Sequence, residues 1–422
     1  MKNHTDVLIF HTAFCAEASQ RSLDATTEIA YANFCCAIPT LRFGMEISMK
    51  NNDYQWALGV AEKIYEKSKA SANRSVDKVP YLTENGIFDD WSDRISWWTN
   101  GFYGGQMWQL YHAYGDEIFK AVAENIEDKL DGSLMDYQGM DHDSGFKWLL
   151  TSVANYKITK NPKSRNRGLL AAANLAGRFN LAGNFIRAWN NWGEENQAGW
   201  AIIDCMMNLP LLYWAAEEID DPRFVQIAKA HADTAIRAFV RENGSCNHIV
   251  RFNPETGEII DSLGGQGKEV GSSWTRGQAW AVYGFALSYR HTKDEKYLET
   301  AKKVGKYFAS NILESGLIPV DFCQDEGLDW EDSTAAAIAS CGMLEIAEYC
   351  EGEEKEFFYN AALKMLKALE EKRSVWDTNV DNILDGGSVA YNDEKHNFSI
   401  VYGDYYFTEA IFKLCDKELF MW

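Results

Sequence analysis

Residues Gly199–Ala216 read GWAIIDCMMNLPLLYWAA, an apolar run with a single acidic residue, Asp204. The run is long and consists almost entirely of Ile, Met, Leu, Trp, Tyr and Ala, so it predicts a buried helix. Because an unpaired buried charge is strongly unfavourable, Asp204 must be hydrogen-bonded, paired or protonated. Burial raises the pKa of a carboxyl group, and a carboxyl group that titrates near neutrality can both donate and accept a proton. On this run alone, an aspartate that caps or bridges helices is the favoured interpretation.

The rest of the chain repeats one pattern at predicted helix starts: an acidic residue, an aromatic residue three positions later and an alanine four positions after that. The four copies are Asp116–Phe119–Ala123, Asp221–Phe224–Ala228, Asp294–Tyr297–Ala301 and Glu354–Phe357–Ala361. An acidic first turn suits the helix dipole, and the aromatic residue and the alanine share one helix face. Another helix with a bulky apolar face precedes each copy, over residues 99–114, 200–218, 274–292 and 331–349. The repeating unit is therefore a helical hairpin, and hairpins must stack to bury their apolar faces.

Two more pairs, residues 144–159 with 163–180 and residues 52–70 with 404–418, bring the expected count to about twelve helices. Six hairpins can stack as an open solenoid or close into a toroid. Long loops rich in Gly, Asn, Trp, Asp and His connect them, over residues 71–98, 181–199, 243–273, 313–330 and 372–403. Long functional loops on one face fit a closed barrel better than a solenoid. We therefore predict an all-α fold, an (α/α)6 barrel or six-hairpin toroid.

We expect residues 49–422 to form this barrel as a single domain. Residues 1–48 show no clean helical stripe, and Met45 and Met49 lie at the end of this segment. We interpret it as an N-terminal appendage, or as an over-extended start with the true one at Met45 or Met49.

Composition excludes several classes of function. The formal net charge of −21 argues against binding to nucleic acid or to an anionic membrane. No stretch reaches the length of a membrane span, and DVLIFHTAFCA, residues 6–16, is a poor secretory signal. Nine cysteines occur without a CxxC pair or metal-ligand spacing, which fits reduced thiols in the cytoplasm. Aromatic residues make up 14% of the chain and could serve a large core or stack on sugar rings.

The long loops carry the residues that could perform chemistry. Trp91, Trp97 and Trp98 lie in WSDRISWWTNGFYGG, where they could pack on the barrel rim or form a platform for a ligand. The motif DHDSGF, residues 141–146, suggests a metal site but lacks a companion cluster of His or Cys ligands. Asp143 could instead be a helix N-cap or accept hydrogen bonds from sugar hydroxyls, and on these residues alone the N-cap is favoured.

The loop at residues 243–273 contains His248 and the glycine-rich LGGQG, residues 263–267. We expect no strand before these glycines, and the GxGxxG spacing of nucleotide-binding proteins is absent. The glycines therefore indicate a loop that approaches a ligand closely.

The motif SSWTRGQAW begins a predicted helix and contains Trp274, Arg276 and Trp280. Two aromatic planes and a guanidinium form a good environment for a sugar carboxylate. Arg276 could alternatively form a salt bridge at the rim with Asp332.

Asp143 and Asp204 come from different hairpins, and paired carboxylates suggest glycoside chemistry. From about residue 52 to its end, the chain resembles the unsaturated glucuronyl hydrolases, a glycoside hydrolase family with an (α/α)6 barrel. The motifs that carry the resemblance are, in order, WWTNGF, DHDSGF, FIRAWN, IIDCMMNLPLLYWA, SSWTRGQAWAVYGFAL, EDSTAAAIASCGMLEIA and YGDYYFTEA.

The resemblance implies activity on oligosaccharides that polysaccharide lyases leave behind, with a 4,5-unsaturated uronic acid at the non-reducing end. One Asp would protonate C4 of the double bond and activate a water that adds at C5, and the resulting hemiketal would rearrange and release the shortened sugar. Neither a metal nor an organic cofactor is implied. The expected partner is this unsaturated oligosaccharide, with no nucleic acid and no membrane, and the sequence is compatible with a monomer or a homodimer.

The acid/base role falls on Asp204 of IIDCMMNLP, and the role of holding the uronate ring hydroxyls falls on Asp143 of DHDSGF. The other positions that match the pocket of the family are Trp98, His142, Trp189, His248, Gln266, Trp274, Arg276 and Trp280. Where the family often has His before Gln266, this chain has Gly265. Residues 386–398 lie where family members select the second sugar, so the preference among chondroitin, hyaluronan and heparin fragments stays open.

Three other functions are weighed against this one. Unsaturated rhamnogalacturonyl hydrolases share the fold and the chemistry and act on pectin fragments, but WTRGQAW and DHDSGF favour the glucuronyl group. A polysaccharide lyase usually needs a Tyr/His or Asn/His pair, which is not grouped here. A non-catalytic carbohydrate-binding scaffold would keep the aromatic pocket but would not need both Asp143 and Asp204.

Overall fold

The computed structural model describes residues 28–191 and 193–422, with side chains from residue 51 onward. The appendage or over-extended start predicted at residues 1–48 lies entirely outside the residues whose side chains are described, and its first 27 residues lie outside the description altogether. That interpretation stays a prediction.

The chain divides into two units, residues 1–53 and 54–422. In the described part of the first unit the backbone is helical from Glu28, where α1 (Glu28–Arg74) begins. The second unit contains the end of α1 and every other helix and strand, and the candidate site lies within it.

Thirteen α-helical segments occur in the described residues, and α4 and α5 form one continuous helix through a π-helical turn, Leu149–Val153, which leaves twelve helices. After α1 they are α2 (Phe102–Tyr114), α3 (Glu117–Leu134), α4 (Ser144–Trp148), α5 (Ala154–Thr159), α6 (Pro162–Gly177), α7 (Leu209–Ile219), α8 (Pro222–Ala238), α9 (Thr275–Thr292), α10 (Glu295–Ser310), α11 (Ser333–Glu348), α12 (Gly352–Lys372) and α13 (Val401–Leu414).

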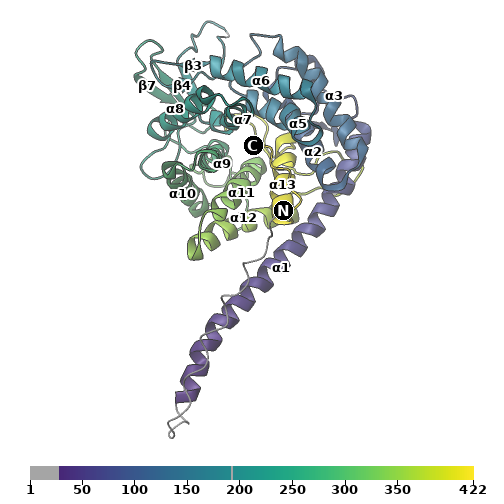
Figure 1. Ribbon diagram of the computed structural model, residues 1–422, viewed down its shortest axis with the longest axis vertical. Helices are drawn as coiled ribbons and strands as arrows, with labels where there is room; N and C mark the ends of the chain where they lie inside the picture. The colour runs from purple at the N-terminus through teal and green to yellow at the C-terminus, as the bar shows by residue number, and fades with distance from the viewer. Residues whose placement is uncertain (1–27, 192) are drawn as a thin grey trace, which may run out of the picture. The chain divides into compact units, whose positions relative to one another are not determined.

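The helices of the second unit form two concentric rings. The inner ring consists of α2, α4–α5, α7, α9, α11 and α13, each packed against the next, and α13 closes the ring against α2 (Figure 1). An outer helix packs behind the inner one that precedes it, as α3 does behind α2 and α8 behind α7. This arrangement is an (α/α)6 barrel, so the predicted all-α fold is confirmed.

The acidic residues that marked helix starts in the sequence lie at helix N-termini. Asp116 and Asp221 are the N-cap residues of α3 and α8, and their side chains accept hydrogen bonds from the backbone N–H groups of Ile118 and Arg223. Asp332 caps α11 through two N–H groups of its first turn. These bonds satisfy donors that the first turn leaves unpaired, and they fix where each helix begins.

The run Gly199–Ala216 is not one helix, and this prediction is wrong. Trp200–Ile202 form strand β5, Ile203–Met207 form a 3-10 helix, η4, and α7 follows. Pro210 lies in the first turn of α7, where its missing N–H is tolerated, whereas the same proline would break a helix that began earlier. Asp204 therefore lies in a turn between a strand and a helix rather than inside a helix.

Short strands occur where only loops were expected. Strand β5 pairs with β6 (Ile249–Phe252), and β6 pairs with β7 (Ile259–Leu263), in an antiparallel sheet. Two small hairpins are β1 (Thr83–Glu84) with β2 (Ile87–Phe88), and β3 (Phe179–Asn180) with β4 (Phe185–Ile186). The glycines of LGGQG therefore do follow a strand, contrary to expectation, because strands of this length show no clear alternation in the sequence.

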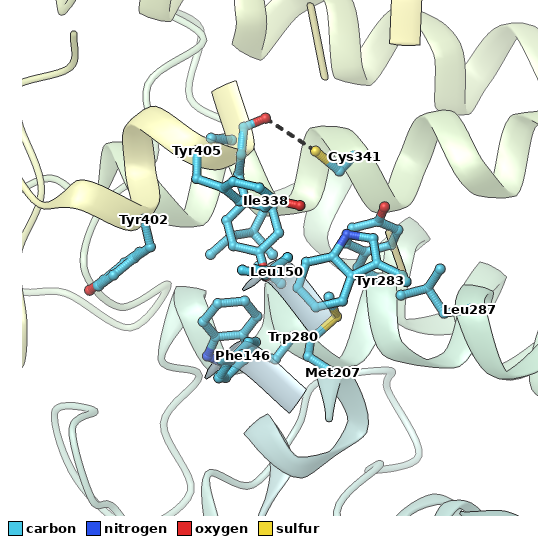
Figure 2. Close-up of a cluster of buried hydrophobic side chains, with 14 of the residues drawn as sticks. Phe146, Leu150, Met207, Trp280, Tyr283, Leu287, Ile338, Cys341, Tyr402 and Tyr405 are labelled. Carbon is cyan, nitrogen blue, oxygen red and sulfur yellow. Dashed lines mark hydrogen bonds between the residues drawn. The ribbon is translucent and has the colours of Figure 1, made fainter. Parts of the chain in front are cut away.

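Large side chains from the inner helices fill the centre of the ring. Figure 2 shows Phe146, Trp280, Tyr283 and Tyr405 converging on this cluster, together with Cys341, whose thiol donates a hydrogen bond to a backbone carbonyl of α13. The Phe146 and Trp280 rings lie 5.0 Å apart at a tilt of 44°. The barrel is thus packed through its middle.

Gly342 of α11 provides a test of this packing. A Cβ at Gly342 would lie 2.9 Å from both the backbone N and the Cα of Tyr283 in α9. Because backbone atoms of two packed helices cannot easily move apart, we expect Gly342→Ala to lower the free energy of unfolding by roughly 2 kcal/mol. Gly59 of α1 has no atom within 4 Å of a Cβ, so Gly59→Ala should be neutral or stabilising by up to about 1 kcal/mol. Chemical denaturation compares the two variants, and equal stabilities would contradict the close approach of α9 and α11.

Candidate active site

A cavity of about 700 Å³ lies at the end of the barrel where the inner helices begin. Its wall includes residues in or just before the first turns of α4, α9 and α13, the segments that precede α2 and α7, strands β5 and β6, and residues 189–190, 265–266 and 389–393. This volume is typical of a site for a small ligand such as a disaccharide.

Nine of the ten residues predicted to form the site line this cavity. They are Trp98, His142, Asp143, Trp189, Asp204, His248, Gln266, Trp274 and Arg276. The exception is Trp280, which is fully buried and does not line the cavity. Residues four apart share a helix face, so Trp280 continues the face of Arg276 one turn deeper, into the core. The structure therefore does not support contact between Trp280 and a ligand, and Trp280 lies below Asp204 instead.

The carboxyl group of Asp204 is almost completely removed from water. Only 16% of its side chain is exposed, and its Oδ1 atom is buried without a hydrogen-bond partner in the described residues. Burial raises the pKa of Asp204 to about 7, against the opposing effects of the Arg276 charge and the Trp280 indole. Nε2 of His248 lies 3.9 Å from Oδ1. Asp204 can therefore exchange a proton near neutral pH, as the sequence indicated.

Asp143 occupies the N-cap position of α4, but its side chain does not cap the helix. Its Oδ1 instead accepts a hydrogen bond from Nδ2 of Asn208 at 3.2 Å, and its Oδ2 lies 3.5 Å from Nε2 of His142. The capping role favoured on the residues alone is therefore wrong. Burial and the neighbouring charges of Asp141 and Asp204 raise the pKa of Asp143 well above its usual value.

Two buried imidazoles flank the carboxyl groups. Burial lowers the pKa of His142 to about 4 and that of His248 to about 3, so both rings are neutral at physiological pH. The Nδ1 atom of His248 accepts a hydrogen bond from the backbone N–H of Gln266 at 3.0 Å. This bond assigns the proton of His248 to Nε2, the atom that faces Asp204.

Arg276 forms the salt bridge with Asp332 that the sequence left open as an alternative, and it also lines the cavity. Its Nη1 forms a buried ion pair with Asp332 and donates to the backbone carbonyl of Ser388, and its Nη2 donates to that of Val389. The guanidinium carbon also lies 4.4 Å from the ring centre of Trp274. Arg276 nevertheless lines the cavity, and the N–H groups of Nε and Nη2 that these bonds do not use form a fork suited to a carboxylate.

The three tryptophans of the first long loop have different surroundings. Trp98 lines the cavity and packs against Phe146 and Tyr402, at ring distances of 5.6 and 5.0 Å. Trp97 also lines the cavity and is 39% exposed. Trp91 does not line it and packs on the rim, 5.3 Å from Trp97. Packing on the rim is therefore confirmed for Trp91, and the ligand platform stays a prediction for Trp97 and Trp98.

Several cavity residues were not identified from the sequence. They include Tyr81, Gln138, Asn190, Asp393 and Tyr402. Tyr402 begins the motif YGDYYFTEA at the start of a helix, which is the only signal that could have identified it. The others lie in loops whose placement depends on distant contacts.

Among the described residues, no group of three or more His, Cys, Asp or Glu side chains lies close enough to hold a metal ion. No helix in the described segments is long and apolar enough to cross a membrane.

Comparison with known proteins assigns the chain to a family. The sequence pattern of Glycosyl Hydrolase Family 88 matches residues 66–417. The chain belongs to this family. It is 34% identical over 348 residues to the unsaturated glucuronyl hydrolase of Bacillus sp. strain GL1, covering 80% of this chain and 91% of that protein. It is 32% identical to the unsaturated chondroitin disaccharide hydrolase of Streptococcus pneumoniae, covering 75% of this chain and 81% of that protein.

Solved structures agree with this assignment. The unsaturated glucuronyl hydrolase of Streptococcus agalactiae superposes with a TM-score of 0.81 at 29% identity, covering 88% of this chain and 94% of that one. The Bacillus enzyme superposes with a TM-score of 0.79 at 33% identity, covering 86% and 96%. The chain is therefore a glycoside hydrolase of the family and fold that its motifs predicted, and both predictions are confirmed.

The raised pKa of Asp204 predicts a dependence of stability on pH. A carboxyl group whose pKa is higher in the folded state than in the unfolded state destabilises the fold as pH rises from about 4 to about 7. Asp204→Asn removes this penalty, so its melting temperature should match that of the wild type only below about pH 4, and the difference should grow up to about pH 7 and reach a few degrees at pH 8. The ion pair with Arg251 lowers the pKa of Asp261, so Asp261→Asn should show no such gain. Equal wild-type and Asp204→Asn melting temperatures at pH 8 would contradict the buried, titrating carboxyl group.

Proposed function

We propose that the protein releases 4,5-unsaturated glucuronic acid from the non-reducing end of lyase-generated glycosaminoglycan oligosaccharides, by hydration of the C4–C5 double bond. The observation that carries this proposal is the carboxyl group of Asp204, which is buried in a cavity of sugar size and titrates near neutrality. The names of the relatives support the substrate class. A mutant of the Streptococcus agalactiae unsaturated glucuronyl hydrolase has been crystallised in complex with dGlcA-GalNAc6S.

The proposed reaction needs one group that first donates and then accepts a proton. Protonated Asp204 transfers its proton to C4, and the positive charge that develops at C5 is shared with the ring oxygen. The Asp204 carboxylate then takes a proton from a water molecule whose oxygen bonds to C5. A pKa near the working pH suits both steps. The hemiketal at C5 opens to a ketone, and the remaining sugar leaves from C1.

Other cavity residues would hold the uronate ring in place. The Asp143 carboxylate accepts hydrogen bonds from ring hydroxyls, and the free fork of Arg276 binds the sugar carboxylate. Trp98 and Trp189 supply aromatic surface for the apolar faces of the sugar rings. Local charge from Arg276 is needed because the net charge of −21 repels an anionic substrate at long range.

A cytoplasmic location is part of the proposal. The six cysteines in the described residues are all free thiols, and five of them are buried. Reduced thiols without disulfides fit a reducing compartment. Small unsaturated oligosaccharides that have entered the cell would then be the substrates.

The Asp204→Asn variant tests the chemistry. Unsaturated chondroitin, hyaluronan and heparin disaccharides absorb in the ultraviolet through the conjugated double bond, and wild type should remove this absorbance. Asp204→Asn should lower kcat by roughly 10³-fold or more, because the amide can neither donate nor accept the proton, while substrate binding changes little. Calorimetry on the variant measures that binding. Retained turnover in Asp204→Asn would contradict the acid/base role.

The same assay separates the remaining functions. Wild-type inactivity on glycosaminoglycan fragments with turnover of unsaturated pectin fragments would favour the rhamnogalacturonyl hydrolase chemistry. Binding without any turnover, unchanged in Asp204→Asn, would favour a carbohydrate-binding scaffold.

The pH profile gives a second test. Since the protonated form of Asp204 starts the reaction, kcat/KM should fall as pH rises through about 7. Asp404 is a matched control, because burial raises its pKa to about 7 as well and it does not line the cavity. The fall should persist in Asp404→Asn, and a profile that stays flat to pH 9 in the wild type would contradict the assignment.

A further inference from the structure

Asn208 contacts the carboxyl group of Asp143 and the backbone of Asp204, and its side chain does not cap its own helix. It is the N-cap residue of α7, a position where an asparagine side chain ordinarily accepts a hydrogen bond from the first turn of that helix. No such bond is formed. The residue is completely buried, and its amide is turned toward α4 instead.

Both ends of the Asn208 amide are bound. Its Oδ1 accepts a hydrogen bond from the backbone N–H of Phe146, in the first turn of α4, at 2.9 Å. Its Nδ2 donates to Oδ1 of Asp143 at 3.2 Å and to the backbone carbonyl of Asp204 at 3.3 Å. One planar group therefore contacts the helix that follows Asp143 and the turn that carries Asp204.

The bond to Phe146 is the bond that Asp143 would make as an ordinary N-cap. A capping aspartate accepts from the second or third N–H of its helix, and Phe146 is the third residue of α4. Because Asn208 accepts from this N–H, the carboxylate of Asp143 is not needed as a cap and lines the cavity.

Close packing fixes this exchange of roles. A Cβ at Gly145 would lie 2.6 Å from Cα of Asn208 and 2.7 Å from its Oδ1, so the backbones of α4 and of the start of α7 touch. Position 208 also requires an amide side chain, because it must both accept one hydrogen bond and donate another. An aspartate at 208 could accept from Phe146 but could not donate to Asp143, and an aliphatic side chain could do neither.

We propose that Asn208 is a positioning residue that caps α4 in place of Asp143 and thereby directs the Asp143 carboxylate into the cavity beside Asp204. The residue acts through Asp143 and does not itself line the cavity. The consequence for turnover rests on the proposed function, whereas the consequence for the orientation of Asp143 does not.

The ionisable groups around Asp143 set the direction of the expected pH effect. They come from its own loop, from α4 and from η4, and are Asp141, His142, Lys147, Asp204 and Cys205. Lys147 and the Asn208 amide favour the ionised form of Asp143, and the two other carboxylates oppose it. Loss of the amide donor, or a further carboxylate at 208, should therefore raise the pKa of Asp143.

The test compares Asn208→Asp with Asn155→Asp. Asn155 is also buried and donates from Nδ2 to a carboxylate, Glu127, but it lies in α5 and does not line the cavity. We expect Asn208→Asp to lower kcat on the unsaturated disaccharide roughly 10- to 100-fold and to shift the pH profile to higher pH. Asn155→Asp should lose a similar amount of thermal stability with an unchanged profile. Equal kinetics and equal profiles in the two variants would overturn the proposal.

Asn208→Ala gives a readout that needs no activity. Without the Asn208 acceptor, a crystal structure should show the Asp143 carboxylate rotated to accept from the N–H of Phe146. A carboxylate that still points into the cavity would overturn the proposal. An inactive wild type with this rotation in Asn208→Ala would instead count against the proposed function and leave the positioning role intact.

Discussion

Asp143 and Asp204 are both buried in the same cavity, and two buried carboxyl groups are unfavourable unless neighbouring groups compensate. Only a few groups from separate elements compensate for this burial. They are the amide of Asn208, the neutral ring of His248 and the guanidinium of Arg276. Such incomplete compensation leaves Asp204 with a pKa near neutrality. The reactivity of the site and its cost to stability therefore have the same origin.

The barrel makes this arrangement possible by bringing the starts of the inner helices to one end. The N-termini of α4, α9 and α13 lie at the cavity. Each helix start carries a partial positive charge from its peptide dipoles, which favours an anion. A chain with a net charge of −21 can thus present a locally favourable environment to a uronate. Trp280 belongs to the packed aromatic core of the barrel, and its indole interacts with Asp204 at the site.

The fold could be predicted from the sequence because its signals are local. Four of the six hairpins carry an acidic start and each has an apolar face, and closure of the ring follows from burying six such faces together. The site was recovered where residues lie in continuous motifs, as for Trp274 and Arg276. Three features of the structure could not be predicted from the sequence, and they share one cause. The strand at 200–202, the depth of Trp280 and the exchange of capping roles between Asp143 and Asn208 all depend on contacts between segments far apart in the chain.

The most direct test of the double-bond hydration chemistry follows the oxygen atom of water. The wild type would turn over an unsaturated disaccharide in ¹⁸O-labelled water, with immediate borohydride reduction to prevent exchange. Mass spectrometry then locates the label in the released uronate. Hydration initiated by Asp204 places the labelled oxygen on C5, because the ring oxygen stays on C1 when the hemiketal opens. Label on C1 would show direct attack at the anomeric carbon and would contradict the account.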